Sequence, residues 1–268
     1  MGKKKRIAIF LFGLVALGAL FFWRYRAPGG ATYSAGVTPH HLLAEQMIRD
    51  VFASVALCPK PEIIVLVGPD HFNQSAVFGN KLITAGAGAE EIEKVPIISD
   101  LLRQKLPSAD FYPSTGAIKK DHAIIDLLPF VAEYLPGVNV LPILVPARFE
   151  QERMRAVAEY LNEKLPGNSM VLASVDFSHY KTKAEAELED AESIPTLLEF
   201  KEDNFRNIAV DCRQCLYLAR YFAELRGAEN SLALDHKNSQ DFSAEAVTST
   251  TSYFTALFYK DKPECVEN

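Results

Sequence analysis

The sequence contains few cysteines and no internal repeat. Four cysteines in 268 residues are too few to form a disulfide framework for a chain of this length. The absence of a repeating period excludes solenoid architectures. The first thirty positions contain no acidic residue and carry six of the 28 basic ones, which leaves 22 basic against 34 acidic residues beyond them, a net charge of −12. A surface of that sign repels phosphate backbones, which argues against nucleic-acid binding.

The N-terminal segment has the pattern of a membrane anchor. Four basic residues at positions 3–6 precede seventeen uncharged residues, 7–23, and two more basic residues follow. A helix of that length spans about 25 Å, at the short end of what crosses a bilayer. Trp23 and Tyr25 stand where an interfacial aromatic belt is expected, and no clean small-x-small cleavage motif follows the apolar run. We therefore expect residues 1–30 to form an uncleaved single-pass anchor and linker, with a cytoplasmic N-terminus and an extracytoplasmic globular domain.

Beyond this segment, apolar runs alternate with amphipathic stretches. Near-continuous runs of Val, Ile and Leu are typical of strands that helices cover on both faces. We predict one α/β domain over residues 31–260, with a mixed, mostly parallel central sheet flanked by helices, and a flexible tail over residues 261–268. The predicted strands are 32–38, 62–68, 139–146, 169–176 and 249–260, and the predicted helices are 41–57, 95–106, 122–135, 149–165 and the helical region 182–225.

Histidines stand at turns that follow the predicted strands. His40 comes after the first strand and His71 after the second, while Asp176 and His179 follow a third, and His122 begins a helix. Because the carboxyl ends of parallel strands meet at one sheet edge, we expect these side chains to share a crevice. Two imidazoles with a carboxylate suit a divalent transition metal, and with open positions they suit iron. Asp176 is compatible both with orienting an imidazole and with capping a helix.

Two other features have weaker functional signals. His236 lies in a predicted loop and is interpreted as structural. Cys212 and Cys215 form a C-x-x-C pair at the start of an apolar helix. Without a second pair, this motif supports neither a structural zinc site nor a thioredoxin-like centre.

The turn motifs also occur in a recognisable order. They are Thr38-Pro39-His40, Gly68-Pro69-Asp70-His71, Asp121-His122-Ala123 with Leu128-Pro129-Phe130, and Ser174-Val175-Asp176-Phe177-Ser178-His179-Tyr180. Together they resemble the Memo family, also called AmmeMemoRadiSam system protein B, which is similar in fold to class III extradiol dioxygenases. The resemblance covers nearly all of residues 32–260. It implies the dioxygenase-like fold and a metal-binding crevice.

The resemblance also implies roles for individual residues. His40 and His71 correspond to two imidazole metal ligands. His122, Asp176 and His179 correspond to polar groups that bind or activate a substrate. The expected cofactor is a divalent transition metal, with iron as the first choice and copper or zinc as alternatives.

The third ligand stays open at this point. The family has a cysteine at the start of a helix, where related dioxygenases use a carboxylate. In this chain the matching stretch holds both Asp211 and Cys212. The chain also departs from the family pattern after Pro39-His40, where Ala-Gly-Tyr is replaced by His41-Leu42-Leu43.

Three functions follow as hypotheses. The first is a metal-dependent oxidoreductase related to extradiol dioxygenases, and the second is a zinc-dependent amide hydrolase on the same scaffold. The third is a non-catalytic module that binds a peptide or small ligand. The expected partners are a small molecule or peptide, the membrane through the N-terminal helix, and proteins of the AmmeMemoRadiSam system.

Overall fold

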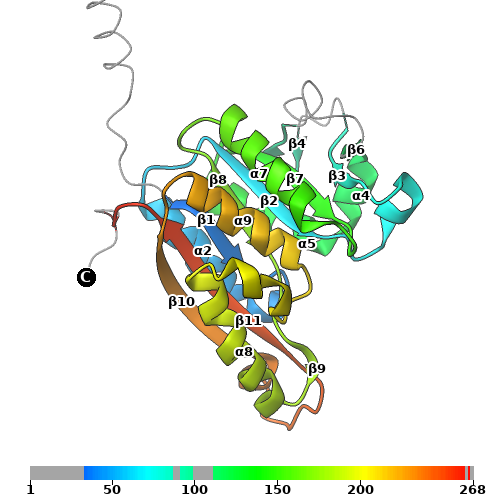
Figure 1. Ribbon diagram of the computed structural model, residues 1–268, viewed down its shortest axis with the longest axis vertical. Coiled ribbons are helices and arrows are strands. Elements are labelled where there is room, and N and C mark those ends of the chain that lie inside the picture. The colour runs from blue at the N-terminus through cyan, green and yellow to red at the C-terminus, as the bar shows by residue number, and fades with distance from the viewer. Residues whose placement is uncertain (1–32, 87–90, 99–110, 263–264, 266–268) are drawn as a thin grey trace, which may run out of the picture. The chain divides into compact units, whose positions relative to one another are not determined.

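A nine-stranded mixed sheet forms the centre of the described part of the protein. The computed structural model describes residues 33–86, 91–98, 111–262 and 265 (Figure 1). The strand order is β10-β11-β1-β8-β2-β7-β3-β6, with β9 paired to β11. These strands are β1 (Tyr33–Thr38), β2 (Ile63–Pro69), β3 (Leu82–Thr84), β6 (Phe111–Pro113), β7 (Asn139–Val145), β8 (Met170–Ser174), β9 (His179–Lys181), β10 (Asn230–Asn238) and β11 (Thr250–Tyr259), and a separate hairpin pairs β4 (Glu91–Ile92) with β5 (Val95–Pro96).

The four central strands are parallel. β8 lies between β1 and β2, and β7 pairs with the other side of β2. The neighbouring strands join this unit in antiparallel fashion, β11 on β1 and β3 on β7. The carboxyl ends of β1, β2 and β8 therefore meet at one edge of the sheet, where ligands bind in open α/β folds.

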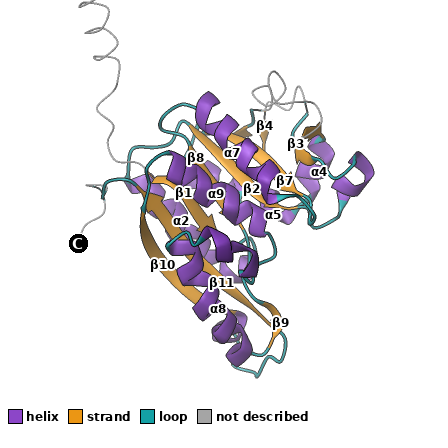
Figure 2. Ribbon diagram, in the orientation of Figure 1, coloured by secondary structure: helices purple, strands orange, loops and turns teal. Residues whose placement is uncertain are grey.

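Helices cover both faces of the sheet (Figures 1 and 2). Along β2, Val65 and Val67 belong to the core on one face and Ile64 and Leu66 to the core on the other, as the two-residue period of a strand requires. One face packs against α7 (Gln151–Lys164) and α9 (Arg213–Leu225), which lie against each other. The helices on the other face are α2 (Glu45–Leu57), α4 (Thr115–Lys120), α5 (His122–Ile125) and α6 (Leu128–Tyr134).

The predicted fold class needs one correction. The predicted mixed α/β domain with a central sheet agrees with the structure. The prediction that a transmembrane helix precedes this domain as part of the fold was wrong. In the residues that the structure describes, no helix is both long and apolar enough to cross a bilayer. The segment on which that prediction rested, residues 1–30, lies outside the described residues.

Several predicted elements differ in detail. The start of the predicted helix 95–106 is extended, since β5 pairs with β4 and Ile97 bridges to Val140, while residues 99–106 lie outside the described residues. The predicted helix 122–135 is two helices, α5 and α6, because Pro129 in the first turn of α6 has no N–H to continue a preceding helix. His236 lies in β10, where a loop was expected.

The predicted helical region 182–225 divides into three helices. They are α8 (Lys183–Leu198), the 3-10 helix η3 (Glu202–Asn207) and α9. A capping box at Thr182 and Glu185 begins α8, because each residue's side chain accepts a hydrogen bond from the other's backbone N–H. This region brings the start of α9 to the edge where β8 ends, since the Asp211 N–H donates to the Asp176 carbonyl at 3.1 Å.

All four cysteines form disulfides. Cys58, which follows α2, is bonded to Cys265, which lies in the segment predicted as a flexible tail. Cys212 is bonded to Cys215 at the start of α9. The first bridge joins residues 207 positions apart, whereas the second closes only one helical turn.

Candidate metal centre

His40 lies at the base of the site, beyond the end of β1. Its backbone N–H donates to Asp176 Oδ1 at 3.2 Å, and the residue is only 2% exposed. Burial lowers the pKa of its imidazole well below the usual value, and the neighbouring rings of His71 and His122 lower it further. His40 is therefore neutral near neutral pH.

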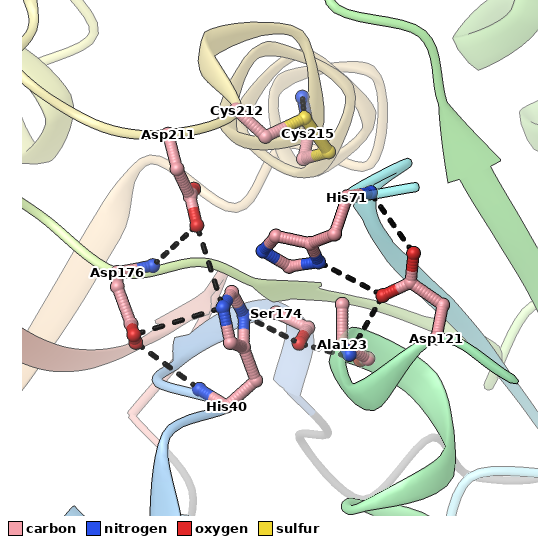
Figure 3. The surroundings of a disulfide bond; sticks show 9 residues. All are labelled: His40, His71, Asp121, Ala123, Ser174, Asp176, Asp211, Cys212 and Cys215. Carbon is pink, nitrogen blue, oxygen red and sulfur yellow. Dashed lines mark hydrogen bonds and ion pairs between the residues drawn. A yellow bond between two sulfur atoms is a disulfide. The ribbon is translucent and has the colours of Figure 1, made fainter. Parts of the chain in front are cut away.

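A chain of hydrogen bonds fixes the tautomer of His40 (Figure 3). Ser174, the last residue of β8, donates its hydroxyl proton to the Ala123 carbonyl at 2.6 Å. The same oxygen lies 3.3 Å from His40 Nδ1. Because the hydroxyl has only one proton, it accepts from Nδ1–H. The Nε2 atom of His40 consequently carries a free lone pair.

His71 is oriented in the same way by Asp121, the N-cap of α5. Its Nδ1 lies 2.8 Å from Asp121 Oδ1, and its backbone N–H donates to Oδ2 at 2.9 Å. Asp121 is 1% exposed and also accepts from the Ala123 N–H at 3.0 Å. A carboxylate that receives three N–H groups holds the proton of His71 on Nδ1, which leaves Nε2 as a donor atom for a metal.

The approach of α5 to the sheet brings in a third histidine. Gly68 in β2 allows this approach, because a Cβ at this position would lie 2.7 Å from the Ala123 Cβ. His122 begins α5, and its ring stacks on that of His71 with the centroids 3.8 Å apart. One ring nitrogen from each of His40, His71 and His122 lies within 4.8 Å of the other two.

Two carboxylates face the same region. Asp176 Oδ2 lies 3.6 Å from His40 Nε2, and Asp211 Oδ2 lies 3.5 Å from it, although the Asp211 carboxylate also accepts the Asp176 N–H at 3.3 Å. Burial raises the pKa of both carboxyl groups, and the charge of Asp176 raises that of Asp211 further, to well above its usual range.

This geometry fits a divalent cation. The lone pair of His40 Nε2 and the two carboxylates are all acceptors, and acceptors this close repel one another unless a proton or a cation lies among them. Neutral imidazoles with hydrogen-bonded Nδ1–H groups and adjacent carboxylates form the usual donor set of transition-metal sites.

Comparison with known proteins agrees with the resemblance that the order of the turn motifs indicated. A family model described as Memo-like protein matches residues 31–257. The chain belongs to the Memo-like family. The resemblance predicted from the strand-end motifs is thereby confirmed.

Relatives of this Memo-like chain occur in archaea. A MEMO1 family protein of Caldivirga maquilingensis is 23% identical over 236 residues, which cover 84% of this chain and 82% of the relative. Another, from Pyrobaculum aerophilum, is 26% identical over 247 residues, which cover 86% of this chain and 85% of the relative. An uncharacterized Escherichia coli K12 protein of known crystal structure aligns with 83% of this chain and 99% of its own length, at 9% identity and a TM-score of 0.44.

A pocket of about 320 Å³ lies beside the histidines of this Memo-like domain. It is lined by His71 and Asp211 together with His179, whose pKa is lowered mainly by burial. Tyr180 lies on its rim, 86% exposed and with a left-handed φ of 58°. The remaining lining residues are Ser178, Glu189, Ala209 and Val210.

The sequence left Asp211 and Cys212 as alternatives for the third metal ligand, and the structure distinguishes them. The carboxylate of Asp211 points to His40, and its side chain is 15% exposed. The sulfur of Cys212 is bonded to that of Cys215 and accepts the Cys215 N–H at 3.2 Å. In this disulfide form Asp211, and not Cys212, offers a free donor group to the histidines.

The other predicted site residues lie at three different places in the site. His122 joins His40 and His71 in the cluster, whereas the resemblance had implied a substrate-binding role for it. Asp176 holds the backbone of His40, and His179 lines the pocket.

Sequence reasoning missed the positioning residues. Asp121 and Ser174 orient the two imidazoles, and each stands within a motif that the sequence analysis quoted, which was the available signal. His236, which was interpreted as structural, has its Nε2 2.9 Å from buried Asp190, which also accepts from the Ser178 hydroxyl at 2.8 Å.

Proposed function

We propose that this Memo-like protein is a metal-dependent enzyme that acts on a small molecule. His40 and His71 hold one divalent transition metal through their Nε2 atoms, and Asp211 supplies the carboxylate. The observation that carries the proposal is the set of oriented lone pairs and buried carboxylates, which face one another at 3.5 to 3.6 Å around His40 Nε2.

Iron is the metal that this donor set favours. Two histidines and one carboxylate with open positions suit ferrous iron in oxygenases, which supports an oxidoreductase related in chemistry to extradiol dioxygenases. When bound, the metal supplies Lewis acidity toward a substrate oxygen. Metal analysis of the purified protein distinguishes iron from copper and zinc.

The chain's own residues then orient the substrate and move protons. Tyr180 offers an aromatic face at the rim of the pocket, and His179 lines its wall. Because burial lowers its pKa, His179 is neutral near neutral pH and accepts a proton from a bound ligand. His122, stacked on His71, limits the space beside the centre. Asp176 is a positioning residue, because its Oδ1 accepts the backbone N–H of His40.

Metal analysis of the full chain tests this proposal. Anaerobically purified parent protein is expected to bind one metal ion per chain, and His40→Ala and His71→Ala are each expected to lose it. His41→Ala is the matched control, because His41 is exposed and its Nδ1 only caps the adjacent 3-10 helix at Leu43. Metal retained in both cluster variants would contradict the proposal, whereas a parent without metal under any condition would favour a metal-free binding module.

Oxygen dependence tests the reaction class. Compounds that raise the melting temperature of the metal-loaded protein more than that of the His40→Ala variant are carried into an oxygen-electrode assay. Oxygen consumption by the parent that His179→Ala lowers at unchanged metal content is the expected result. Turnover that proceeds equally without oxygen would contradict an oxidoreductase.

A second candidate function rests on His122. Three imidazoles are the ligand set of some catalytic zinc sites, and a nearby carboxylate with a raised pKa can act as a general base. A zinc-dependent amide hydrolase would use that arrangement. Zinc binding that is lost in His122→Ala, together with oxygen-independent amide hydrolysis, would favour it over the oxidoreductase.

We also propose that the domain works in an oxidising compartment. Disulfides persist in such compartments and are rare in the cytosol of most organisms. The two bridges of this chain support an extracytoplasmic location. Alkylation of protein taken directly from cells tests this, since labelling of Cys58 or Cys265 without prior reduction would contradict it.

A further inference from the structure

The Cys212–Cys215 disulfide lies beside the candidate metal centre (Figure 3). A bridge over three residues constrains the unfolded chain far less than one over 207, so stability explains the short bridge less well than the long one. Its position at the N-cap of α9, directly after Asp211, points to a role in the site.

Asp211 connects this disulfide to the histidines. Its backbone N–H donates to the Asp176 carbonyl at 3.1 Å, and its carboxylate lies 3.5 Å from His40 Nε2. Cys212 is the next residue, and its carbonyl accepts the N–H groups of Cys215 and Leu216 in the first turn of α9. A change in the conformation of that turn therefore moves Asp211, because a single peptide bond joins Asp211 to Cys212.

Both cysteines of the pair are buried, and Cys212 is slightly more exposed than Cys215. Asp211 and Arg213, on either side of Cys212, are exposed as whole residues, although the Asp211 side chain is only 15% exposed, while Cys212 is 4% and Cys215 0% exposed. The start of α9 thus lies at the surface, with Cys212 just below it. A small shift of this turn opens Cys212 to attack, so we expect thiol–disulfide exchange to begin at the Cys212 sulfur.

We propose that the Cys212–Cys215 pair is a redox switch that changes the donor set of the metal centre; this inference rests on the metal site proposed above. In the disulfide state, Asp211 is the donor presented to the histidines. Reduction by a dithiol breaks the S–S bond and places one hydrogen on each sulfur, while the dithiol becomes a disulfide. The Cys212 sulfur is then free to act as a donor.

The switch alters which metal the site prefers. Histidine and carboxylate donors suit iron, whereas an added sulfur donor shifts the preference toward zinc and Cu(I). The oxidised and reduced proteins are therefore expected to select different ions from the same mixture. The Cys58–Cys265 bridge follows α2, outside the turn that carries Asp211, and has no such effect.

Cobalt(II) is the probe for this inference, because thiolate ligation gives it a strong charge-transfer absorption in the near ultraviolet. The oxidised full chain is expected to bind Co²⁺ without this band and to gain the band after reduction with a phosphine. Cys215→Ser, which keeps a free Cys212, is expected to show the band without reductant. Cys212→Ser is expected to lack it in both conditions.

Two controls separate the possible failures. The double variant Cys58→Ser with Cys265→Ser is expected to keep the redox response of the parent. Co²⁺ binding that is lost in His40→Ala, but is identical in the oxidised parent, the reduced parent and Cys215→Ser, would overturn the switch and leave the metal centre standing. A parent that binds no Co²⁺ in either state would overturn the metal centre and the switch together.

Discussion

Replacing Asp121 by Asn tests whether the orientation of His71 prepares a metal site. Asp121 accepts three N–H groups, from His71 Nδ1, the His71 backbone and the Ala123 backbone, and it is almost completely buried. An asparagine has one oxygen and one amino group at the same place. Its amino group must face either the His71 backbone N–H or Nδ1, and both are donors at present.

One arrangement lowers the stability of the fold, and the other lowers the affinity of the site for metal. If the amino group faces the backbone N–H of His71, a partly buried donor loses its partner, which costs up to about 3 kcal/mol of stability. If it faces Nδ1, the proton of His71 moves to Nε2 and the lone pair for the metal is lost. Loss of such an orienting partner lowers metal affinity about 10- to 100-fold, which is about 1.4 to 2.7 kcal/mol of binding free energy.

The assay is competitive titration of Zn²⁺ or Fe²⁺ against a chelator of known affinity. Asp203→Asn is the matched control, because Asp203 lies in η3 and is exposed, so this variant removes one carboxylate without touching the site. Circular dichroism checks that both variants fold. A folded Asp121→Asn protein with the metal affinity of the Asp203→Asn control would refute the reasoning.

Three further predictions follow from the same structure. The double variant Cys58→Ser with Cys265→Ser should lower the free energy of unfolding by up to about 5 kcal/mol, since the bridge spans 207 residues, and urea denaturation that shows no loss would contradict this. Metal affinity should rise with pH, because the raised pKa of Asp211 means that metal binding displaces a proton from its carboxyl group, whereas the lowered pKa of His40 keeps Nε2 unprotonated even below pH 6.5, the usual pKa of histidine. Calorimetry in two buffers should detect the released proton, and a metal affinity that does not change between about pH 5 and 8 would argue against this prediction. Gly68→Ala should cost about 1 to 3 kcal/mol because α5 must move away from β2, and an unchanged melting temperature would show that this contact is not tight.

The central strands and the position of the site were predictable from the sequence for a simple reason. β2 and β7 are buried on both faces and so appear as continuous apolar runs, IIVLVGP and NVLPILV. Turns that follow parallel strands share one edge, which is why His40 and His71 could be placed together from their positions alone.

Other elements gave no such signal. β10 is partly exposed along most of its length, and its sequence NSLALDHKN has no clear two-residue alternation, so it was not predicted as a strand and His236 was placed in a loop. β3 and β6 have three residues each, too few for a periodic pattern. The pairing of Cys58 with Cys265 depends on the folded chain and not on spacing.

The finer structure of the site depends on contacts between distant residues. Ser174 fixes the tautomer of His40 because its proton goes to the Ala123 carbonyl, and these three residues come from three separate segments. Asp211 and Cys212 are adjacent in the sequence, so only their side-chain directions separate a free carboxylate from a sulfur held in a disulfide.

The central claim is that His40, His71 and Asp211 hold one divalent metal ion. Anomalous diffraction from crystals of the oxidised protein, grown with Fe²⁺ under anaerobic conditions, tests this most directly. The account predicts one strong anomalous peak among the Nε2 atoms of the histidines and the Asp211 carboxylate. Iron that binds elsewhere, with no peak between His40 and His71, would contradict it.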